Sequence, residues 1–312
     1  MNYFNGLIGQ DSVKKKLSFY IKAFEKTSQA PFLLLSGAKG LGKTEFAKAF
    51  AKNLSNQEGD KRPFLELNCS TIKNNEQFFE QIFLPLIMDN EITILFDECH
   101  ALPKDLTMAF LTIFNTESNS KKNFEWNGMS FEFNFRNQTF IFATTETDKI
   151  FPPLKDRLTT IDFDAYSQPE LAEIVQACLP EIELQGDCAT EVASTIRGNA
   201  RSAVKRAKEI DLYCGSKDQN TFSSSDFKDL SEQIGILPMG LTNTEKQVLE
   251  VLKQVGSTTL TGLSARLGLS KTCLQRDHEL YLLNKNLIEI DGQRKITMQG
   301  RQVYNSIICQ IN

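Results

Sequence analysis

The sequence predicts an α/β domain built on a parallel sheet, followed by a small all-helical domain and a third domain of helices and a short β-hairpin. Two observations carry this prediction. Apolar, strand-like runs alternate with helical stretches over residues 1–164, which is typical of a parallel sheet covered by helices. Helical periodicity then takes over in residues 165–238, and residues 239–312 combine helical periodicity with two short strand-like runs.

Length and composition fit a soluble protein of two or three domains. The 312 residues exceed a typical single domain, and 41% hydrophobic with 24% charged residues is ordinary for globular proteins. We find no apolar run near the ~20 residues of a membrane span, and the N-terminus lacks the layout of a signal peptide. We therefore expect a cytoplasmic protein.

Cysteine spacing and charge exclude some classes of function. The seven cysteines form no C-x-x-C pair and the chain has two histidines, which argues against a disulfide framework or a zinc site. The net charge of −4 gives no general reason to expect nucleic acid. Residues 241–312, however, carry nine Lys/Arg against six Asp/Glu, so a nucleic-acid contact is expected at that end.

Strands are expected at four apolar runs of the first domain: "PFLLLSG", "FLELNCS", "ITILFDE" and "FIFATT". Their near-continuous hydrophobicity suits strands that are buried on both faces. No strand is expected in the helical domain, and "GILPMG" at 235–240 marks its end. The third domain should contain three helices and then the strands "LIEID" and "RKIT", joined by a tight turn at Asp291-Gly292.

A phosphate-binding loop is predicted at "GAKGLGKT", residues 37–44, between the first strand and a helix. Its glycines, Gly37, Gly40 and Gly42, let backbone N–H groups curl around phosphate oxygens at a helix N-terminus. Lys43 would bring a positive charge to the outer phosphates, and Thr44 would offer a hydroxyl to Mg²⁺. The spacing and the strand–loop–helix context together predict an ATP or ADP site with magnesium.

Two adjacent carboxylates, Asp97 and Glu98, end the strand "ITILFDE", at the sheet edge where open α/β sheets bind ligands. Asp97 would help to hold magnesium, and Glu98 would polarise the attacking water. A helix N-cap is the alternative explanation for one of them. Thr145 ends a neighbouring strand and could hydrogen-bond the water or the γ-phosphate, although a threonine-rich strand end is commonly just a turn.

An apolar β-hairpin is predicted at about residues 122–136, around the turn Asn127-Gly128. Its alternation places six large apolar side chains on one face: Phe124, Trp126, Met129, Phe131, Phe133 and Phe135. This face could cover the protein's own core or dock another protein, and the hairpin alone does not decide between them.

The ordered set of the phosphate loop, "DECH", "ATT", "PLKDRL" and "RGNARSA" resembles the AAA+ ATPases. Within them it is similar to the RuvB family, bacterial motors of Holliday-junction branch migration. The resemblance runs from "FNGLIGQDSVKKKL" to "ITMQGRQVY", and "GILPMGLTNTEKQVLEVL" resembles the entry to that family's winged-helix DNA-binding domain. Ala38-Lys39, Ala200 and Gly292 depart from the family pattern, which implies a divergent member.

The resemblance implies roles for further residues. Ile8, Gly9 and Tyr166 would line the nucleotide base, Thr145 resembles sensor 1, and Arg201 resembles the sensor 2 arginine. Arg157 resembles the arginine finger that enters a neighbouring subunit's site, which implies a hexameric ring around duplex DNA. Taken singly, each arginine could be an ordinary surface ion pair.

The same resemblance implies two partners. A RuvA-like junction-binding protein would dock on the hairpin, through Phe124, Trp126, Met129 and Phe131. Sequence-non-specific DNA would contact the third domain at Lys271, Arg276, Arg294 and Lys295, unless that domain packs against protein instead. The leading hypothesis is a branch-migration ATPase; the alternatives are a AAA+ loader or remodelling switch that acts on a partner protein, and an inactive structural subunit.

Overall fold

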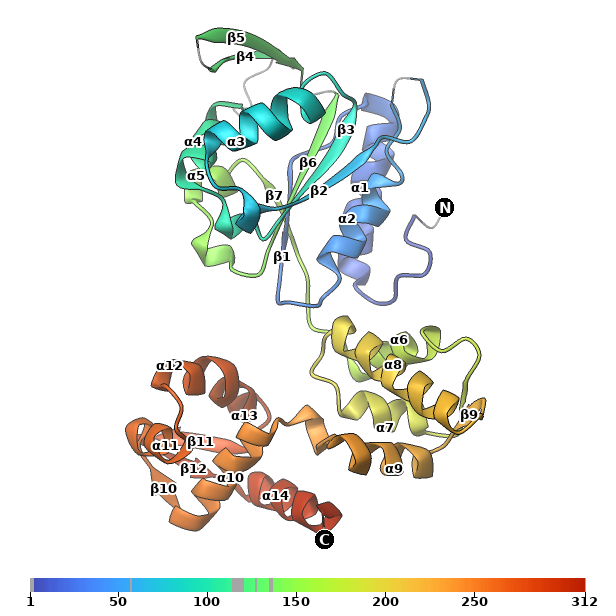
Figure 1. Ribbon diagram of the computed structural model, residues 1–312, viewed down its shortest axis with the longest axis vertical. Coiled ribbons are helices and arrows are strands. Elements are labelled where there is room, and N and C mark those ends of the chain that lie inside the picture. The colour runs from blue at the N-terminus through green and yellow to red at the C-terminus, as the bar shows by residue number, and fades with distance from the viewer. Residues whose placement is uncertain (1–2, 57, 114–120, 127, 135–136, 312) are drawn as a thin grey trace. The chain divides into compact units, whose positions relative to one another are not determined.

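The computed structural model describes residues 3–56, 58–113, 121–126, 128–134 and 137–311 (Figure 1). The chain forms two compact units. Unit 1 comprises Met1–Glu170 together with Asn199–Arg201, and unit 2 comprises Leu171–Gly198 and Ser202–Asn312. Within the described ranges, no helix has both the length and the apolar character needed to cross a membrane.

Unit 1 is built on a five-stranded sheet in the order β2-β3-β6-β1-β7, in which every pair is parallel. The strands are β1 (Leu33–Ser36), β2 (Phe64–Asn68), β3 (Ile92–Asp97), β6 (Gln138–Thr144) and β7 (Thr159–Asp162). The central strands β1, β3 and β6 are buried along nearly their whole length, as their apolar sequences predict. The parallel α/β fold expected for this part of the chain is confirmed.

Helices cover both faces of this sheet (Figure 1). One face carries α1 (Asp11–Thr27) and α2 (Lys43–Ala51); the other carries α3 (Asn75–Phe78), α4 (Lys104–Ile113) and α5 (Pro152–Lys155). A π-helical segment, η2 (Phe79–Ile87), continues α3, and the 3-10 turns η1 (Cys69–Thr71), η3 (Cys99–Ala101) and η4 (Thr147–Lys149) follow β2, β3 and β6. Phenylalanines dominate the core on the second face: Phe78, Phe96, Phe110, Phe140 and Phe142.

The predicted hairpin is present as β4 (Lys121–Trp126) and β5 (Met129–Asn134). The register pairs Trp126 with Met129 and Phe124 with Phe131, as the two-residue turn requires. Gly128 has φ 73°, a left-handed conformation that glycine adopts without strain.

The helical part of unit 2 contains α7 (Cys188–Ser194), α8 (Ala200–Ser216) and α9 (Ser224–Ile234), and α6 (Gln168–Ala177) leads into it from unit 1. The prediction of no strand here was wrong, because β8 (Glu183–Leu184) and β9 (Thr221–Phe222) form a short parallel pair. Two-residue strands leave no periodicity in a sequence. The pair is stabilised by Phe222, which is fully buried and packs edge-on against Tyr213.

The C-terminal segment of unit 2 follows the 3-10 turn η5 (Pro238–Gly240). Its helices are α10 (Asn243–Val255), α11 (Leu260–Leu267) and a continuous helical run formed by α12 (Lys271–Cys273), η6 (Leu274–Glu279) and α13 (Leu280–Asn284). The strands β10 (Ser257–Thr258), β11 (Ile288–Asp291) and β12 (Gln293–Ile296) form an antiparallel sheet, and α14 (Met298–Ile311) ends the chain. The three helices and two strands expected here are present, whereas β10 and α14 were not predicted, and the winged-helix assignment stays a prediction.

Candidate active site

The phosphate-binding loop joins the end of β1 to the start of α2. Gly37, Gly40 and Gly42 have φ values of 151°, 83° and 93°, which side chains rarely adopt. A Cβ on Gly37 would also lie 2.9 Å from the Phe163 carbonyl oxygen, so the loop has no room for one. Because α2 begins at Lys43, the N–H groups of its first turn are left to bind an anion beside the loop.

Lys43 is buried beside the loop, with 7% of its surface exposed. Its Nζ donates to the carbonyl oxygens of Gly37 at 2.8 Å and Ala38 at 3.0 Å, so the ammonium lies over the loop that would hold the phosphates. Burial lowers the pKa of Lys43, and the nearby carboxylates of Glu98 and Asp97 partly offset that effect. The ammonium therefore has opposite charge close by in spite of its burial.

Asp97 ends β3 directly beside Thr44. The Thr44 hydroxyl donates to Asp97 Oδ2 at 3.3 Å, so a hydroxyl oxygen and a carboxylate oxygen lie together at the sheet edge. Oxygen donors of this kind are what Mg²⁺ prefers, and the pair fits the metal that the phosphate loop implies. The predicted partnership of Thr44 and Asp97 thus has a geometric basis.

Glu98 directs its carboxylate toward the next strand. Its backbone adopts a left-handed conformation, with φ 52°, at the end of β3. The Thr145 hydroxyl donates to Glu98 Oε2 at 3.2 Å, because β3 and β6 are parallel neighbours whose C-terminal ends lie at the same edge. A carboxylate held in this way is suited to accept a proton from water.

His100 is a site residue that the sequence reasoning missed. Its Nδ1 lies 3.1 Å from Thr144 Oγ1 and 3.5 Å from Glu98 Oε2, while its Nε2 lies 3.1 Å from Glu146 Oε2. The imidazole therefore connects the carboxylate of Glu98 with the segment that follows β6. Its place two residues after Glu98, in "DECH", is the only signal that the sequence offers.

The residues expected around the base lie next to the phosphate loop. Gly9 has φ 63°, and a Cβ there would lie 3.0 Å from Cε1 of Tyr166. The Tyr166 hydroxyl donates to the carbonyl oxygen of Leu41 at 3.1 Å, while Ile8 is half-buried beside Gly9. Gln10 was not predicted. Its Nε2 donates to the carbonyl oxygen of Asp164 at 2.6 Å, which links the segment of Ile8 and Gly9 to the segment of Tyr166.

Of the two expected arginines, the structure brings one to the loop. The Arg201 backbone N–H donates to the carbonyl oxygen of Gly40 at 3.2 Å, and its charge contributes to the lowered pKa of Lys43. Arg157 follows α5 and donates from Nη1 to the carbonyl oxygen of Pro153 at 2.7 Å. Its buried Nε has no hydrogen-bond partner among the described residues, so this guanidinium is only partly satisfied within its own chain.

The expected DNA contacts differ in availability. Lys271 and Arg276 are exposed on the long helix of the C-terminal segment, and Lys295 is half-buried on β12 opposite Glu289. Arg294 is different, because its Nε and Nη2 donate to the two carboxylate oxygens of the buried Glu279 at 2.6 and 3.1 Å. Its guanidinium is thus engaged within the protein, a use that the sequence pattern did not indicate.

One side chain of the apolar hairpin contributes to the core of unit 1. Phe131 is half-buried and packs against the phenylalanine-rich core of unit 1. The side chains of Phe124, Trp126 and Met129 lie outside the described residues, as do Phe135 and Asn127. Glu125, Ser130 and Glu132 are exposed on the other face of the hairpin.

Comparisons with known proteins agree with this geometry. Residues 33–164 match the ATPase family associated with various cellular activities (AAA). The "Holliday junction branch migration complex subunit RuvB" of Pseudothermotoga lettingae is 28% identical over 90% of this chain and 82% of its own length. The protein of that name from Latilactobacillus sakei is 28% identical over 95% of this chain and 86% of its own length.

The fold is also found in solved structures. The Thermotoga maritima structure described as the RuvB Holliday junction branch migration motor superimposes with a TM-score of 0.72 at 22% identity, covering 95% of this chain and 94% of that one. A solved variant of the same protein gives 0.75 at 21% identity, covering 97% of both chains.

A parallel five-stranded sheet, a phosphate loop and two adjacent acids, together with the AAA family match, define a AAA+ ATPase, an ATP-hydrolysing enzyme. Since the similarity to RuvB extends over nearly the whole chain, this protein is a divergent RuvB-like AAA+ ATPase.

Proposed function

We propose that this protein is an ATP-dependent DNA motor that drives the branch migration of Holliday junctions in recombination and repair in the cytoplasm. The observation that carries the proposal is the hydrogen bond from Thr145 to Glu98, within a chain whose similarity to RuvB covers 90% of its residues or more. It joins the residue expected to activate water to the residue expected to sense the γ-phosphate.

In the proposed reaction, Glu98 accepts a proton from the attacking water while Thr145 holds its carboxylate. Lys43 and the N-terminus of α2 bind the outer phosphates, and Arg201, whose backbone N–H binds the Gly40 carbonyl, would add its charge to theirs. Thr44 and Asp97 would hold Mg²⁺, which when bound neutralises charge on the phosphates. Ile8, Gly9 and Tyr166 line the base.

A hexameric ring is part of the proposal. Arg157 would complete the site of the neighbouring subunit, where its guanidinium would gain an anionic partner beyond the Pro153 carbonyl that it binds in its own chain. Lys271, Arg276 and Lys295 would contact DNA phosphates without reading the sequence. A RuvA-like protein would dock on the hairpin at Phe124, Trp126, Met129 and Phe131, and Phe131 also packs against the core of unit 1.

The test is movement of a synthetic four-way junction, measured with and without a RuvA-like junction-binding protein. The wild type with ATP and Mg²⁺ should move the junction, whereas Glu98→Gln should bind nucleotide but lose at least 100-fold in turnover and all movement. Glu66→Gln, which changes an acid outside the site, is the matched control. ATP hydrolysis without junction movement in the wild type under both conditions would refute the proposal.

A second function is favoured by one observation. Glu289 and Asp291 are exposed on the strand that pairs with β12, and Arg294 is held by Glu279. Acidic groups at this hairpin weaken a DNA contact and would suit a loader or remodelling switch that grips a partner protein. ATPase activity that a protein partner stimulates and that DNA leaves unchanged would support this alternative.

A further inference from the structure

A polar cluster joins the helical part of unit 2 to its C-terminal segment. At its centre is Glu245, on α10, whose side chain is fully buried. Its carboxylate accepts hydrogen bonds from the guanidinium of Arg197 and, at 2.8 Å, from the Thr242 backbone N–H. His278 of the long C-terminal helix lies on the other oxygen, with Nδ1 3.4 Å away. The buried charge therefore has partners from both sides of the junction.

Arg197 makes the connection in three ways at once. Besides binding Glu245, it donates from Nε to the carbonyl oxygen of Gly240 at 2.6 Å, and its Cζ lies 4.1 Å from the centre of the Tyr281 ring. The Tyr281 hydroxyl in turn donates to the carbonyl oxygen of Met239. Two consecutive linker carbonyls are thus held by side chains, at Met239 and Gly240, where φ is 57° and 67°. Glycine adopts this conformation freely, but Met239 keeps it only when its surroundings hold it.

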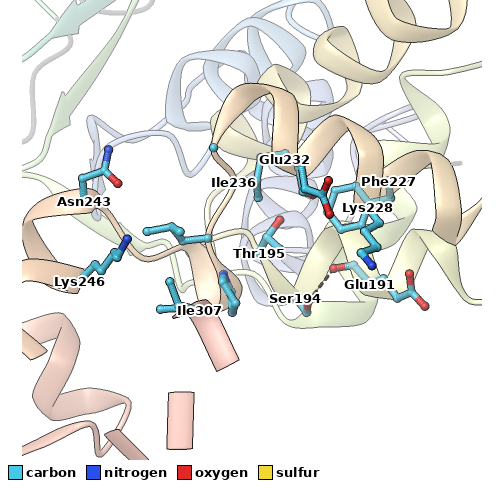
Figure 2. Close-up of a pocket in the computed structure, with 14 residues that line it drawn as sticks. Glu191, Ser194, Thr195, Phe227, Lys228, Glu232, Ile236, Asn243, Lys246 and Ile307 are labelled. Atoms are coloured by element: carbon cyan, nitrogen blue, oxygen red, sulfur yellow. Dashed lines mark hydrogen bonds between the residues drawn. The ribbon is translucent and has the colours of Figure 1, made fainter. Parts of the chain in front are cut away.

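Two cavities lie between the helical part of unit 2 and its C-terminal segment. One cavity of about 540 Å³ lies between α7 and α9 on one side and α10 and α14 on the other; Figure 2 shows Glu191 and Lys228 facing Asn243 and Lys246 across it. A second, of about 410 Å³, borders Arg197 itself. These cavities interrupt the apolar packing at the boundary, and the Arg197 cluster is one of the contacts that cross it.

In the sequence, Arg197 lies close to a segment that packs on the phosphate loop. Arg197 belongs to unit 2, yet Asn199–Arg201 belong to unit 1, where the Arg201 N–H binds the carbonyl oxygen of Gly40. A Cβ on Gly40 would lie 2.9 Å from Asn199 Oδ1, so this segment packs closely on the loop. Only three residues separate Arg197 from Arg201. A shift of Arg201 against bound phosphate must therefore pull on Arg197.

We propose that Arg197 is a positioning residue that transmits the nucleotide state of the phosphate loop to the helix at residues 271–284. The inference rests on the proposed function in so far as that helix carries Lys271 and Arg276 toward DNA. Glu245, His278 and Tyr281 receive the displacement, because each lies on α10 or on this helix and contacts the Arg197 cluster.

The first test is amide hydrogen exchange of the full chain with ADP or with a non-hydrolysable ATP analogue. In the wild type, residues 235–241 and 271–284 should exchange at different rates in the two states. In Arg197→Ala this difference should fall at least fivefold, while residues 37–44 still respond to nucleotide. An equal response in the variant, or no response of these segments in the wild type, would overturn the proposal.

The second test is the ratio of junction movement to ATP turnover. Arg197→Ala should keep basal turnover within twofold and lose at least tenfold in movement per ATP hydrolysed. Lys205→Ala, which removes an exposed cation from the same part of unit 2, should change neither quantity. Equal losses of turnover and movement would show that Arg197 is merely structural. A wild type that never moves junctions refutes the proposed function, while the exchange experiment still decides the role of Arg197.

Glu245→Gln is a second variant, to be used if Arg197→Ala does not fold. The amide keeps an oxygen for the Thr242 N–H but removes the charge that Arg197 binds. If a melting curve shows Arg197→Ala to be unfolded, the folded Glu245→Gln protein takes its place. Its difference in exchange rate between the two nucleotide states should be at least twofold smaller than that of the wild type. A full response in that variant would contradict the proposal.

Discussion

Thr145 Oγ1 donates to Glu98 Oε2 across 3.2 Å, and this bond fixes the carboxylate at the carboxyl edge of the sheet. Thr145→Val keeps the shape of the side chain but removes the donor. We expect a roughly 10-fold loss of kcat, within the range that positioning of a catalytic base contributes, with nucleotide affinity changed less than twofold. Steady-state hydrolysis measures kcat and ADP titration measures the affinity. Thr107→Val, in the first turn of α4, is the control. An unchanged kcat would show that the bond is dispensable.

Arg157 should act on a neighbouring subunit. When Arg157→Ala protein is mixed into wild-type rings, turnover should fall more steeply than the fraction of wild-type subunits, because each variant subunit disables the site beside it. Lys155→Ala, on the same short segment, provides the matched control. A strictly proportional decline across the mixing series is the result that excludes a finger in trans.

Arg294 and Lys295 are adjacent in sequence yet should behave differently. Lys295→Ala should reduce the slope of log K for DNA against log salt by about 1 and leave the melting temperature unchanged. Arg294→Ala leaves Glu279 buried without its partner, so it should destabilise the C-terminal segment by about 3 kcal/mol. Salt titration of DNA binding and thermal unfolding separate the two. Equal effects of both variants on salt dependence would contradict this division.

Substitutions of Trp126 and Phe131 should have different effects, one on stimulation by the partner and the other on stability. Trp126→Ala is expected to preserve basal ATPase and stability but to abolish stimulation by a RuvA-like protein, if the hairpin docks that partner. Phe131→Ala removes a ring that packs on the core and should lower stability by about 2 kcal/mol, less than for a fully buried ring. ATPase assays with added partner and chemical unfolding measure the two effects. Normal stimulation of Trp126→Ala would reject docking through this residue.

The sequence predicts the elements that their own composition and spacing identify. The four apolar strands and the phosphate loop are where their composition places them, because burial on both faces demands continuous hydrophobicity. The strand β7 was missed, since "TTID" has a single fully buried residue and gains its partners only from β1, more than 100 residues earlier. The helix α14, "MQGRQVYNSIICQI", was missed as well.

For the site, the sequence identifies groups but not their partners. Lys43, Thr44, Asp97 and Glu98 follow from local spacing alone. The roles of His100 and Gln10 depend on contacts with Thr144, Glu146 and Asp164, which lie far away in the chain. The engagement of Arg294 by Glu279 is likewise set by how a strand crosses a helix, which charge counting does not reveal.

The buried carboxylate of Glu245 has an implication for how such proteins diverge. A replacement of Arg197 alone would leave a buried anion without its cation, and a replacement of Glu245 alone would remove the carboxylate that binds the Arg197 guanidinium. Substitutions at these two positions should therefore be tolerated mainly as pairs. Swapping the C-terminal segment between distant relatives should fail unless the residue at 197 travels with it.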